Sequence, residues 1–281
     1  VGDMGTVLHW DGTNWISVSS TTTQNLYAVH GSSTSDVWVV GDQGTVLHRT
    51  AGVFSSVVGT GLATSPATAA WAFSPTDVWV AAWGVTAHWN GTTWTQYTSG
   101  FTFLNGRISL YGNLSNDVLA VDYRGTTLRW NGTAWNSVGM SPSNYYNWIW
   151  GTGTNTVWGV GDVITKGLIS RWNGSTWQAD SISVPSTLRG IHGLNSGSIV
   201  AVGDAGLALG YDGTQWTNLG GQSVYQQDLY GVWARTTTDL WGAGSNGNVW
   251  RGNGLGWTIQ PTGATATLNG IWGSAADDVW A

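Results

Sequence analysis

The chain has 281 residues, a formal net charge of −6 and only 9% charged residues, so it lacks the clustered Lys and Arg with which proteins bind nucleic acid. It contains no cysteine and no apolar run of transmembrane length, which argues against disulfides, Cys-ligated metals and membrane insertion. With 42 glycines, 22 tryptophans and no glutamate, the composition favours turns and short strands over helices.

A unit of about 40 residues recurs along the whole chain. Four short strands in a unit of this length are typical of a β-propeller blade. In the second unit the strands read LYAVHG (26–31), DVWVVG (36–41), TVLHRT (45–50) and FSSVV (54–58). The Asp-Val-Trp position of the unit falls in turn at Asp36, Asp77, Asp117, Thr156, Ser198, Asp239 and Asp278.

We predict an all-β fold with one domain, 1–281, that is a seven-bladed propeller of four-stranded antiparallel blades. Blade 1 is composite, because 268–281 supply its first two strands and 1–20 its last two. This pairing closes the ring and removes exposed sheet edges. Blades 2 to 7 are predicted at approximately 26–59, 68–100, 108–139, 147–183, 188–221 and 229–263.

In six of the seven units the third and fourth strands are joined by a turn that begins with Asp-Gly or Asn-Gly, which predicts a type I′ hairpin. A basic residue lies two positions before most of these turns. It follows the repeat's Asp at a fixed distance, giving Asp36/His48, Asp77/His88, Asp117/Arg129, Asp239/Arg251 and, across the closure, Asp278/His9. In the sixth repeat both partners are lost together, as Ser198 and Gly210, which indicates that the paired residues touch. In the fifth, Thr156 faces Arg171.

An aromatic residue or histidine ends the innermost strand of every blade. We expect this ring to pack between neighbouring blades, with a ligand-lined channel as the alternative. Its members are His30, Trp71, Tyr111, Trp150, His192, Trp233 and Trp272.

The repeats resemble two known groups. The Asp–His pairing is similar to that of WD-repeat blades, and the turn residues Asp11, Gly12, Thr13 and Trp15 resemble a degenerate Asp-box of bacterial neuraminidases. The combined pattern DVW…VGD.GTVLHW[DN]GT.W is similar to tryptophan-rich seven-bladed propellers of secreted bacterial proteins, especially those of myxobacteria. This resemblance implies the architecture and little about activity.

No catalytic constellation stands out. Most histidines and arginines are assigned to the pairs and the ring, there is no glutamate, and no serine has a nucleophile-elbow context. We therefore expect no enzyme activity, no cofactor and no metal site. The Asp of the GDxG turns is interpreted as a turn former, with a calcium-binding ring as the alternative.

The loops between the second and third strands and between blades should form the ligand-binding face. Trp83 and Tyr123 break the GDxG pattern on adjacent blades, and aromatic and polar residues gather in the loops around them. Such residues suit stacking on a sugar, and equally a protein interface. The candidate ligand-binding residues are Trp83, Phe101, Phe103, Arg107, Tyr123, Arg124, Tyr145, Tyr146, Tyr225 and Gln226.

We expect a secreted or cell-surface binding module that acts as a monomer. Its favoured partner is a glycan, which would make it lectin-like. The alternative is a protein-interaction or adhesion scaffold within a larger surface protein.

Overall fold

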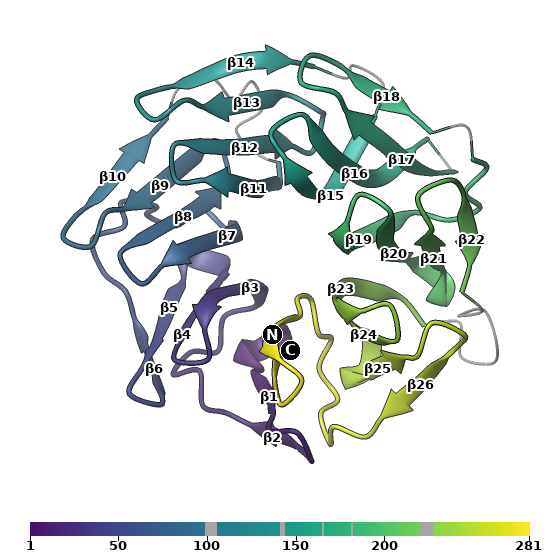
Figure 1. Cartoon of the computed structure of the whole chain (residues 1–281). Coiled ribbons are helices and arrows are strands. Elements are labelled where there is room, and N and C mark those ends of the chain that lie inside the picture. Colours follow the sequence, from purple (N-terminus) through teal and green to yellow (C-terminus); the bar gives the residue numbers. More distant parts are fainter. Residues whose placement is uncertain (99–105, 141–143, 165, 181, 220–226) are drawn as a thin grey trace.

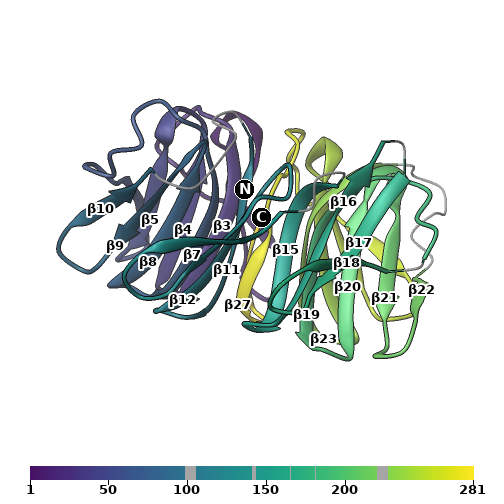
Figure 2. The ribbon, with the colours of Figure 1, turned by 90° about the horizontal axis from the view of Figure 1, so that it is seen from above.

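The computed structural model describes residues 1–98, 106–140, 144–164, 166–180, 182–219 and 227–281. These form seven four-stranded antiparallel sheets around a central axis (Figure 1), which confirms the predicted seven-bladed propeller. Seen from the side, the blades stand next to one another in a disc (Figure 2). No helix in these ranges is long and apolar enough to cross a membrane.

The strands follow the predicted order in every blade, from the channel to the outer edge. Blade 1 comprises β27 (Trp272–Ala275), β28 (Asp278–Trp280), β1 (Leu8–Trp10) and β2 (Trp15–Ser17). Blade 2 comprises β3 (Leu26–Ser33), β4 (Asp36–Gly41), β5 (Val46–Thr50) and β6 (Val53–Ser56). Blade 3 comprises β7 (Ala67–Ser74), β8 (Asp77–Ala82), β9 (Val85–Trp89) and β10 (Trp94–Tyr97). Blade 4 comprises β11 (Ile108–Leu114), β12 (Asp117–Asp122), β13 (Thr127–Trp130) and β14 (Trp135–Gly139).

The remaining blades repeat this arrangement. Blade 5 comprises β15 (Tyr145–Gly153), β16 (Thr156–Val163), β17 (Lys166–Trp172) and β18 (Trp177–Ala179). Blade 6 comprises β19 (Leu188–Asn195), β20 (Ser198–Gly203), β21 (Ala208–Tyr211) and β22 (Trp216–Asn218). Blade 7 comprises β23 (Leu229–Thr236), β24 (Asp239–Gly244), β25 (Val249–Gly252) and β26 (Trp257–Gln260). The turns between second and third strands include the short 3₁₀ segments η1 (Asp3–Gly5), η2 (Asp42–Gly44), η3 (Asp204–Gly206) and η4 (Ser245–Gly247).

Blade 1 closes the ring as predicted. Its sheet has the order β2-β1-β28-β27, with His9 opposite Trp280 and Trp10 opposite Val279. The two chain ends therefore lie close together (Figure 1).

The hairpin between the third and fourth strands differs from the predicted type I′ turn. In the six Asp-Gly or Asn-Gly hairpins only the glycine has a positive φ, for example +94° at Gly12, whereas the blade 2 hairpin has positive φ at both Ala51 (+50°) and Gly52 (+87°). In the six, the side-chain Oδ1 of the Asp or Asn before the glycine instead accepts two backbone N–H groups, from the residues two and three positions further on, at 2.8–3.0 Å. Asp and Asn are thus selected here as acceptors that hold a four-residue loop.

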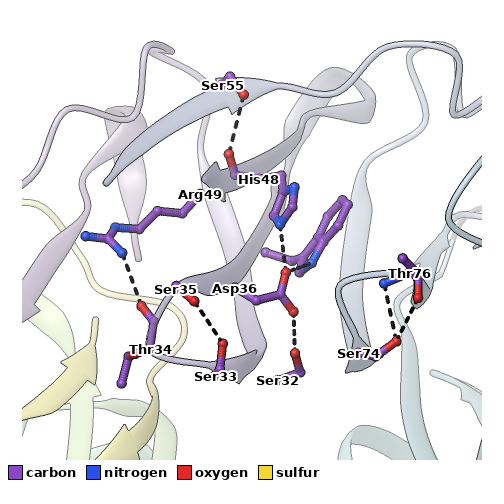
Figure 3. A network of polar contacts seen from close by, with 11 residues as sticks. Ser32, Ser33, Thr34, Ser35, Asp36, His48, Arg49, Ser55, Ser74 and Thr76 are labelled. Atoms are coloured by element: carbon purple, nitrogen blue, oxygen red, sulfur yellow. Dashed lines mark hydrogen bonds and ion pairs between the residues drawn. The ribbon is translucent and has the colours of Figure 1, made fainter. Parts of the chain in front are cut away.

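The Asp–base pairs are present where the sequence predicts them. Each histidine Nε2 lies 2.7 Å from a carboxylate oxygen in Asp36/His48, Asp77/His88 and Asp278/His9. In blade 2 the carboxylate also accepts the indole N–H of Trp38 and the hydroxyl of Ser32 (Figure 3). Desolvation raises the pKa of Asp36, but the hydrogen bonds from His48, Ser32 and Trp38 outweigh it and hold that pKa below its usual value.

Two blades use arginine in the same position. Arg129 donates to Asp117 at 2.7 Å, and Arg251 donates to Asp239 at 3.0 Å. Blade 5 has no Asp at Thr156, and its Arg171 pairs with Asp180 from the outer side of the same blade. These histidines and arginines are therefore structural partners of carboxylates.

Replacing His48 with alanine is expected to lower the free energy of unfolding by about 1–3 kcal/mol, because Asp36 is almost fully buried and would lose a hydrogen-bond partner. The matched variant is His88→Ala, since the side chain of Asp77 is 23% exposed against 3% for Asp36 and water can replace the lost bond. Urea unfolding of both variants measures the difference. Equal losses would contradict the role of burial.

The ring of inner-strand aromatics packs between blades, as predicted. A Cβ added to the glycine of the next blade would lie 2.5–2.9 Å from the aromatic side chain, so each ring fits over a glycine. The pairs are Trp272/Gly31, Trp71/Gly112, Tyr111/Gly151, Trp150/Gly193 and Trp233/Gly273.

The two histidines of the ring are followed in the next blade by alanine instead. The Nδ1 atoms of His30 and His192 accept the backbone N–H of Ala72 and Ala234 at 3.1 and 3.2 Å. A smaller ring leaves room for a methyl group, and the hydrogen bond satisfies an N–H that would otherwise be buried alone. In every pair around the channel, a large ring therefore faces glycine and the smaller histidine ring faces alanine.

Candidate functional site: the mouth of the channel

The central channel is largely filled by side chains. Ala28, Ala69, Gly190, Gly231 and Gly270 keep one inner-strand position small, whereas blade 5 places Trp148 at the corresponding position. Trp148 packs against the buried cores of both the blade 2–3 and the blade 5–6 interfaces, so it reaches across the axis. A cavity of about 60 Å³ remains. The channel is therefore no site for a large ligand, and binding must take place at its ends.

A β-bulge shapes the start of most innermost strands. The register shifts between Leu26 and Ala28 in blade 2, and at the same point in blades 3, 5, 6 and 7. A bulge redirects the side chain of the extra residue. The bulged residues are Tyr27, Thr68, Asn147, Arg189 and Tyr230, all three positions before the inner-strand aromatic or histidine. They form a ring at the loop-face end of the channel.

Blade 4 lacks this bulge. Ile108 lies directly opposite Asp122, where the bulged blades have glycine or alanine. Without the bulge there is space for a side chain, and Asp122 is fully buried. Its Oδ1 accepts the backbone N–H of Arg124 and Thr126, so it holds the turn that carries Tyr123. Desolvation raises the pKa of Asp122.

The Asp of the GDxG turns holds the bulged residues in place. Asp42 accepts the hydroxyl of Tyr27 at 2.9 Å, and Asp204 accepts two guanidinium N–H groups of Arg189. Asp3 accepts the amide of Asn269 in blade 1 at 3.0 Å. The prediction that these carboxylates form their own turns is therefore wrong for Asp3, Asp42 and Asp204, because their oxygens bind side chains of the adjoining inner strand.

Tyrosines and arginines from blades 2, 4, 5, 6 and 7 meet above the channel in three stacked pairs. The Arg107 guanidinium lies 5.6 Å from the ring centroid of Tyr27, and that of Arg189 lies 5.1 Å from the ring of Tyr230. Tyr123 and Tyr145 are stacked with centroids 5.0 Å apart. We call these six residues, Tyr27, Arg107, Tyr123, Tyr145, Arg189 and Tyr230, the mouth cluster.

The mouth cluster is held by backbone contacts between blades 4 and 5. The Tyr123 N–H donates to the carbonyl of Arg107, and the Tyr146 N–H donates to the carbonyl of Tyr123, both at 2.8 Å. Arg107 is exposed and the other five side chains are half-buried. The cluster is thus an ordered surface that a ligand can reach.

The electrostatics of the cluster leave one cation without a carboxylate partner. Desolvation lowers the pKa of Arg189, but the hydrogen bond and charge of Asp204 outweigh it and raise that pKa. Around Arg107, desolvation and then the charge of Arg189 lower its pKa, and only Tyr27 and Tyr230 raise it. Desolvation and then Asp42 raise the pKa of Tyr27 to about 12, so its hydroxyl remains a donor at neutral pH. Within the described residues, Arg107 forms no ion pair.

The predicted binding residues separate into four groups. Arg107, Tyr123 and Tyr145 lie in the mouth cluster. Trp83 is 37% exposed at the turn between β8 and β9, and Arg124 is exposed beside Tyr123. Phe101, Phe103, Tyr225 and Gln226 lie outside the described residues.

Tyr146 does not belong to the surface. It is 1% exposed, its hydroxyl lies 2.9 Å from Ser170 Oγ, and its ring packs on Trp177. Its prediction as a ligand contact is wrong, because Tyr145 and Tyr146 are consecutive residues of a strand and point to opposite sides.

Sequence reasoning missed Tyr27, Arg189 and Tyr230. Their signal was present, since each occupies the position three residues before the inner-strand aromatic or histidine, where Thr68, Asn147 and Asn269 are also polar. Without knowledge of the β-bulge, the residue three positions before the aromatic or histidine looks like any other strand residue, and its direction toward the axis cannot be predicted.

Comparisons with known proteins show the fold and no family. No protein-family model matches the chain, and no curated protein matches it significantly. The predicted relation to tryptophan-rich bacterial propellers and to Asp-box repeats therefore stays a prediction.

Several solved structures share the propeller fold. YCF48 bound to a D1 peptide has a TM-score of 0.68 at 15% identity, over 87% of this chain and 82% of that one. Streptogramin B lyase has a TM-score of 0.74 at 13% identity, over 100% of this chain and 98% of that one. The WD40 propeller domain of Doa1 has a TM-score of 0.72 at 13% identity, over 92% and 93%. At these identities the fold alone is shared. It serves peptide binding in one of these neighbours and belongs to an enzyme in another.

Proposed function

We propose that this protein is a non-catalytic binding module that holds a peptide segment of a partner protein at the mouth cluster. The observation that carries the proposal is the stacking of Tyr27, Tyr123, Tyr145 and Tyr230, each of which has one ring face covered by an arginine or by another tyrosine. The groups left for a ligand are phenol hydroxyls and guanidinium N–H groups. These suit the carbonyls and carboxylates of a peptide better than the flat face of a sugar.

The residue types of the mouth cluster also support a peptide partner. Tyrosine and arginine are enriched among the residues that dominate the energy of protein interfaces, and here they are concentrated at the centre of one face. The propeller of YCF48, which has a similar fold, was solved with a peptide bound. The secreted or cell-surface location expected from composition fits a module that meets its partner outside the cell.

A glycan is the second candidate, and the observation that favours it is Trp83. Its indole is 37% exposed at a turn that carries Asp in blades 1, 2 and 6, and a flat exposed indole suits stacking on a sugar ring. This site would lie on blade 3, and the mouth cluster would take no part in it.

Peptides selected from a random displayed library against the protein are expected to lose about tenfold in affinity when Arg107 is replaced by alanine, because the variant removes an exposed guanidinium from the centre of the site. The matched control is Arg49→Ala. Arg49 also stacks on an aromatic ring, 4.9 Å from the centroid of Trp280, but it lies away from the mouth and donates to the Thr34 carbonyl (Figure 3). Affinity is measured by calorimetry.

Selected peptides that bind Arg107→Ala and Tyr230→Ala as tightly as the parent would overturn the peptide proposal. A glycan array probed with the parent and with Trp83→Ala tests the second candidate, glycan binding at Trp83. Sugar binding that is lost in Trp83→Ala and kept in Arg107→Ala would establish it.

A further inference from the structure

Blade 6 lacks all three of the side chains, a Trp, a basic residue and an Asp, with which blades 1, 2, 3 and 7 fill the gap toward the next blade. In blade 2, Trp38 lies opposite His48 in the sheet, their rings stack with centroids 3.9 Å apart, and Asp36 binds both. The corresponding positions of blade 6 are Val200, opposite Gly210, and Ser198. A stacked indole and imidazole with their carboxylate are thus replaced by a valine, a glycine and a serine.

The missing volume remains as a cavity between blades 6 and 7. It measures about 310 Å³ and is bounded by Val200 and Gly210 on one side and by Ala234 and Leu240 of blade 7 on the other. Leu219 leans over Gly210, where a Cβ would lie 2.9 Å from its Cδ2, so the leucine takes up part of the space and leaves the rest. Exposed Thr217 and Thr237 lie at its rim, which gives a small molecule a way in.

The described residues that line the cavity are mainly apolar and offer no free charge. Ile199, Val200, Ala234 and Leu240 are each at most 5% exposed. Asp212 is the charged residue in the lining, and its carboxylate accepts two backbone N–H groups of its own turn and the hydroxyl of Thr214. A charged ligand would lose its hydration without gaining a partner. Apolar cavities of about half this volume are known to bind molecules of the size of benzene.

We propose that this cavity is a second binding site, independent of the mouth cluster, for a small neutral aromatic molecule. A flat ligand fits because a flat indole and a flat imidazole or guanidinium occupy the same place in blades 1, 2, 3, 5 and 7. The ligand lies between Val200 and Leu240 with its faces against the two blades, and a single polar group on it can reach the Ser198 hydroxyl or the rim.

Indole is the probe that tests the site, because it is the side-chain group that blade 2 places there. In methyl NMR of the whole protein, indole is expected to shift the signals of Val200, Leu219 and Leu240 in a saturable manner. Val200→Trp fills the cavity with the chain's own indole, and binding should weaken by at least about tenfold while the melting temperature rises. Benzamidine, which is flat but cationic, should bind about tenfold more weakly than indole.

The matched control is Ser55→Trp, which adds an exposed tryptophan at the strand position of blade 2 that corresponds to Thr217. It should bind indole as the parent does. Shifts spread over methyl groups elsewhere, or equal binding by Val200→Trp, would overturn the site. Equal or tighter binding of benzamidine would overturn the neutral ligand class. If Val200→Trp fails to fold, Gly210→Val fills the same space from the opposite strand and is read in the same way.

Discussion

Lowering the pH from 7 to 5 is expected to cost about 4 kcal/mol of stability from two half-buried histidines alone, about 2 kcal/mol from each. Desolvation lowers the pKa of His30 to about 4 and that of His192 to about 3. In each ring, Nδ1 already accepts a backbone N–H, so a proton there would break that bond. His30 packs against Trp71 and Trp272, and the charge of Asp36 raises its pKa by less than desolvation lowers it.

The direction follows from proton uptake. The unfolded chain binds a proton on each histidine near its ordinary pKa of about 6.5, whereas the folded chain does not until about pH 4 or below. Between these values the unfolded state holds more protons, so stability rises with pH and is lost as the pH falls through 6.5. The Asp36, Asp117 and Asp278 carboxylates, whose pKa values are lowered, add a further loss only at more acid pH.

Urea midpoints at pH 7 and pH 5 measure this loss. The paired change His30→Trp with Ala72→Gly gives blade 2 the Trp–Gly combination that four other pairs of neighbouring blades already use, and it removes one half-buried histidine. It should reduce the acid loss by about 2 kcal/mol, the contribution of one histidine. The corresponding change, His192→Trp with Ala234→Gly, tests the second histidine in the same way. An acid loss that neither change reduces would assign the pH dependence to other groups.

Replacing Gly112 with alanine is expected to lower the free energy of unfolding by about 1–3 kcal/mol, because the new Cβ would lie 2.5 Å from the Trp71 ring nitrogen and 2.3 Å from Phe73. Gly153→Ala is the matched control on an inner strand, since nothing lies within 4 Å of its added Cβ. That variant should change stability by less than about 0.5 kcal/mol. Chemical unfolding of both variants gives the values.

The ring also predicts a specific rescue. His30 and His192 each face an alanine, so Trp71→His should make Gly112→Ala less harmful than it is in the parent. A double-mutant cycle is expected to show a coupling of about 1–2 kcal/mol between the two positions. Additive effects would mean that the match between ring size and the facing residue has no energetic basis.

The repeated parts of the molecule could be predicted from sequence because they are encoded seven times. The spacing of the Asp-Val-Trp position gave the number of blades, and the joint loss at Ser198 and Gly210 indicated the contact between Asp and base. The hairpin turns were located correctly, but their conformation was not, because the same Asp-Gly pair serves a type I′ turn and a loop capped by a side chain.

The mouth cluster depends on features that the repeat does not record. A bulge of one residue turns Tyr27, Arg189 and Tyr230 toward the axis, and the absence of that bulge in blade 4 makes space for Asp122. Tyr145 and Tyr146 are alike in sequence, and only the strand register decides that one reaches the surface and the other the core. Trp148 extends across the channel because the small residues of other blades leave room for it.

The sequence by itself determined the seven blades, the closure of the ring by its two ends and the carboxylate pairs, because each of these is a local pattern set by spacing along one chain. The tertiary structure alone decided which side chains meet above the channel and where the gap between blades 6 and 7 remains. Arg107 and Tyr27 are 80 positions apart in the chain, and their contact exists only because the ring brings blades 2 and 4 to the same axis.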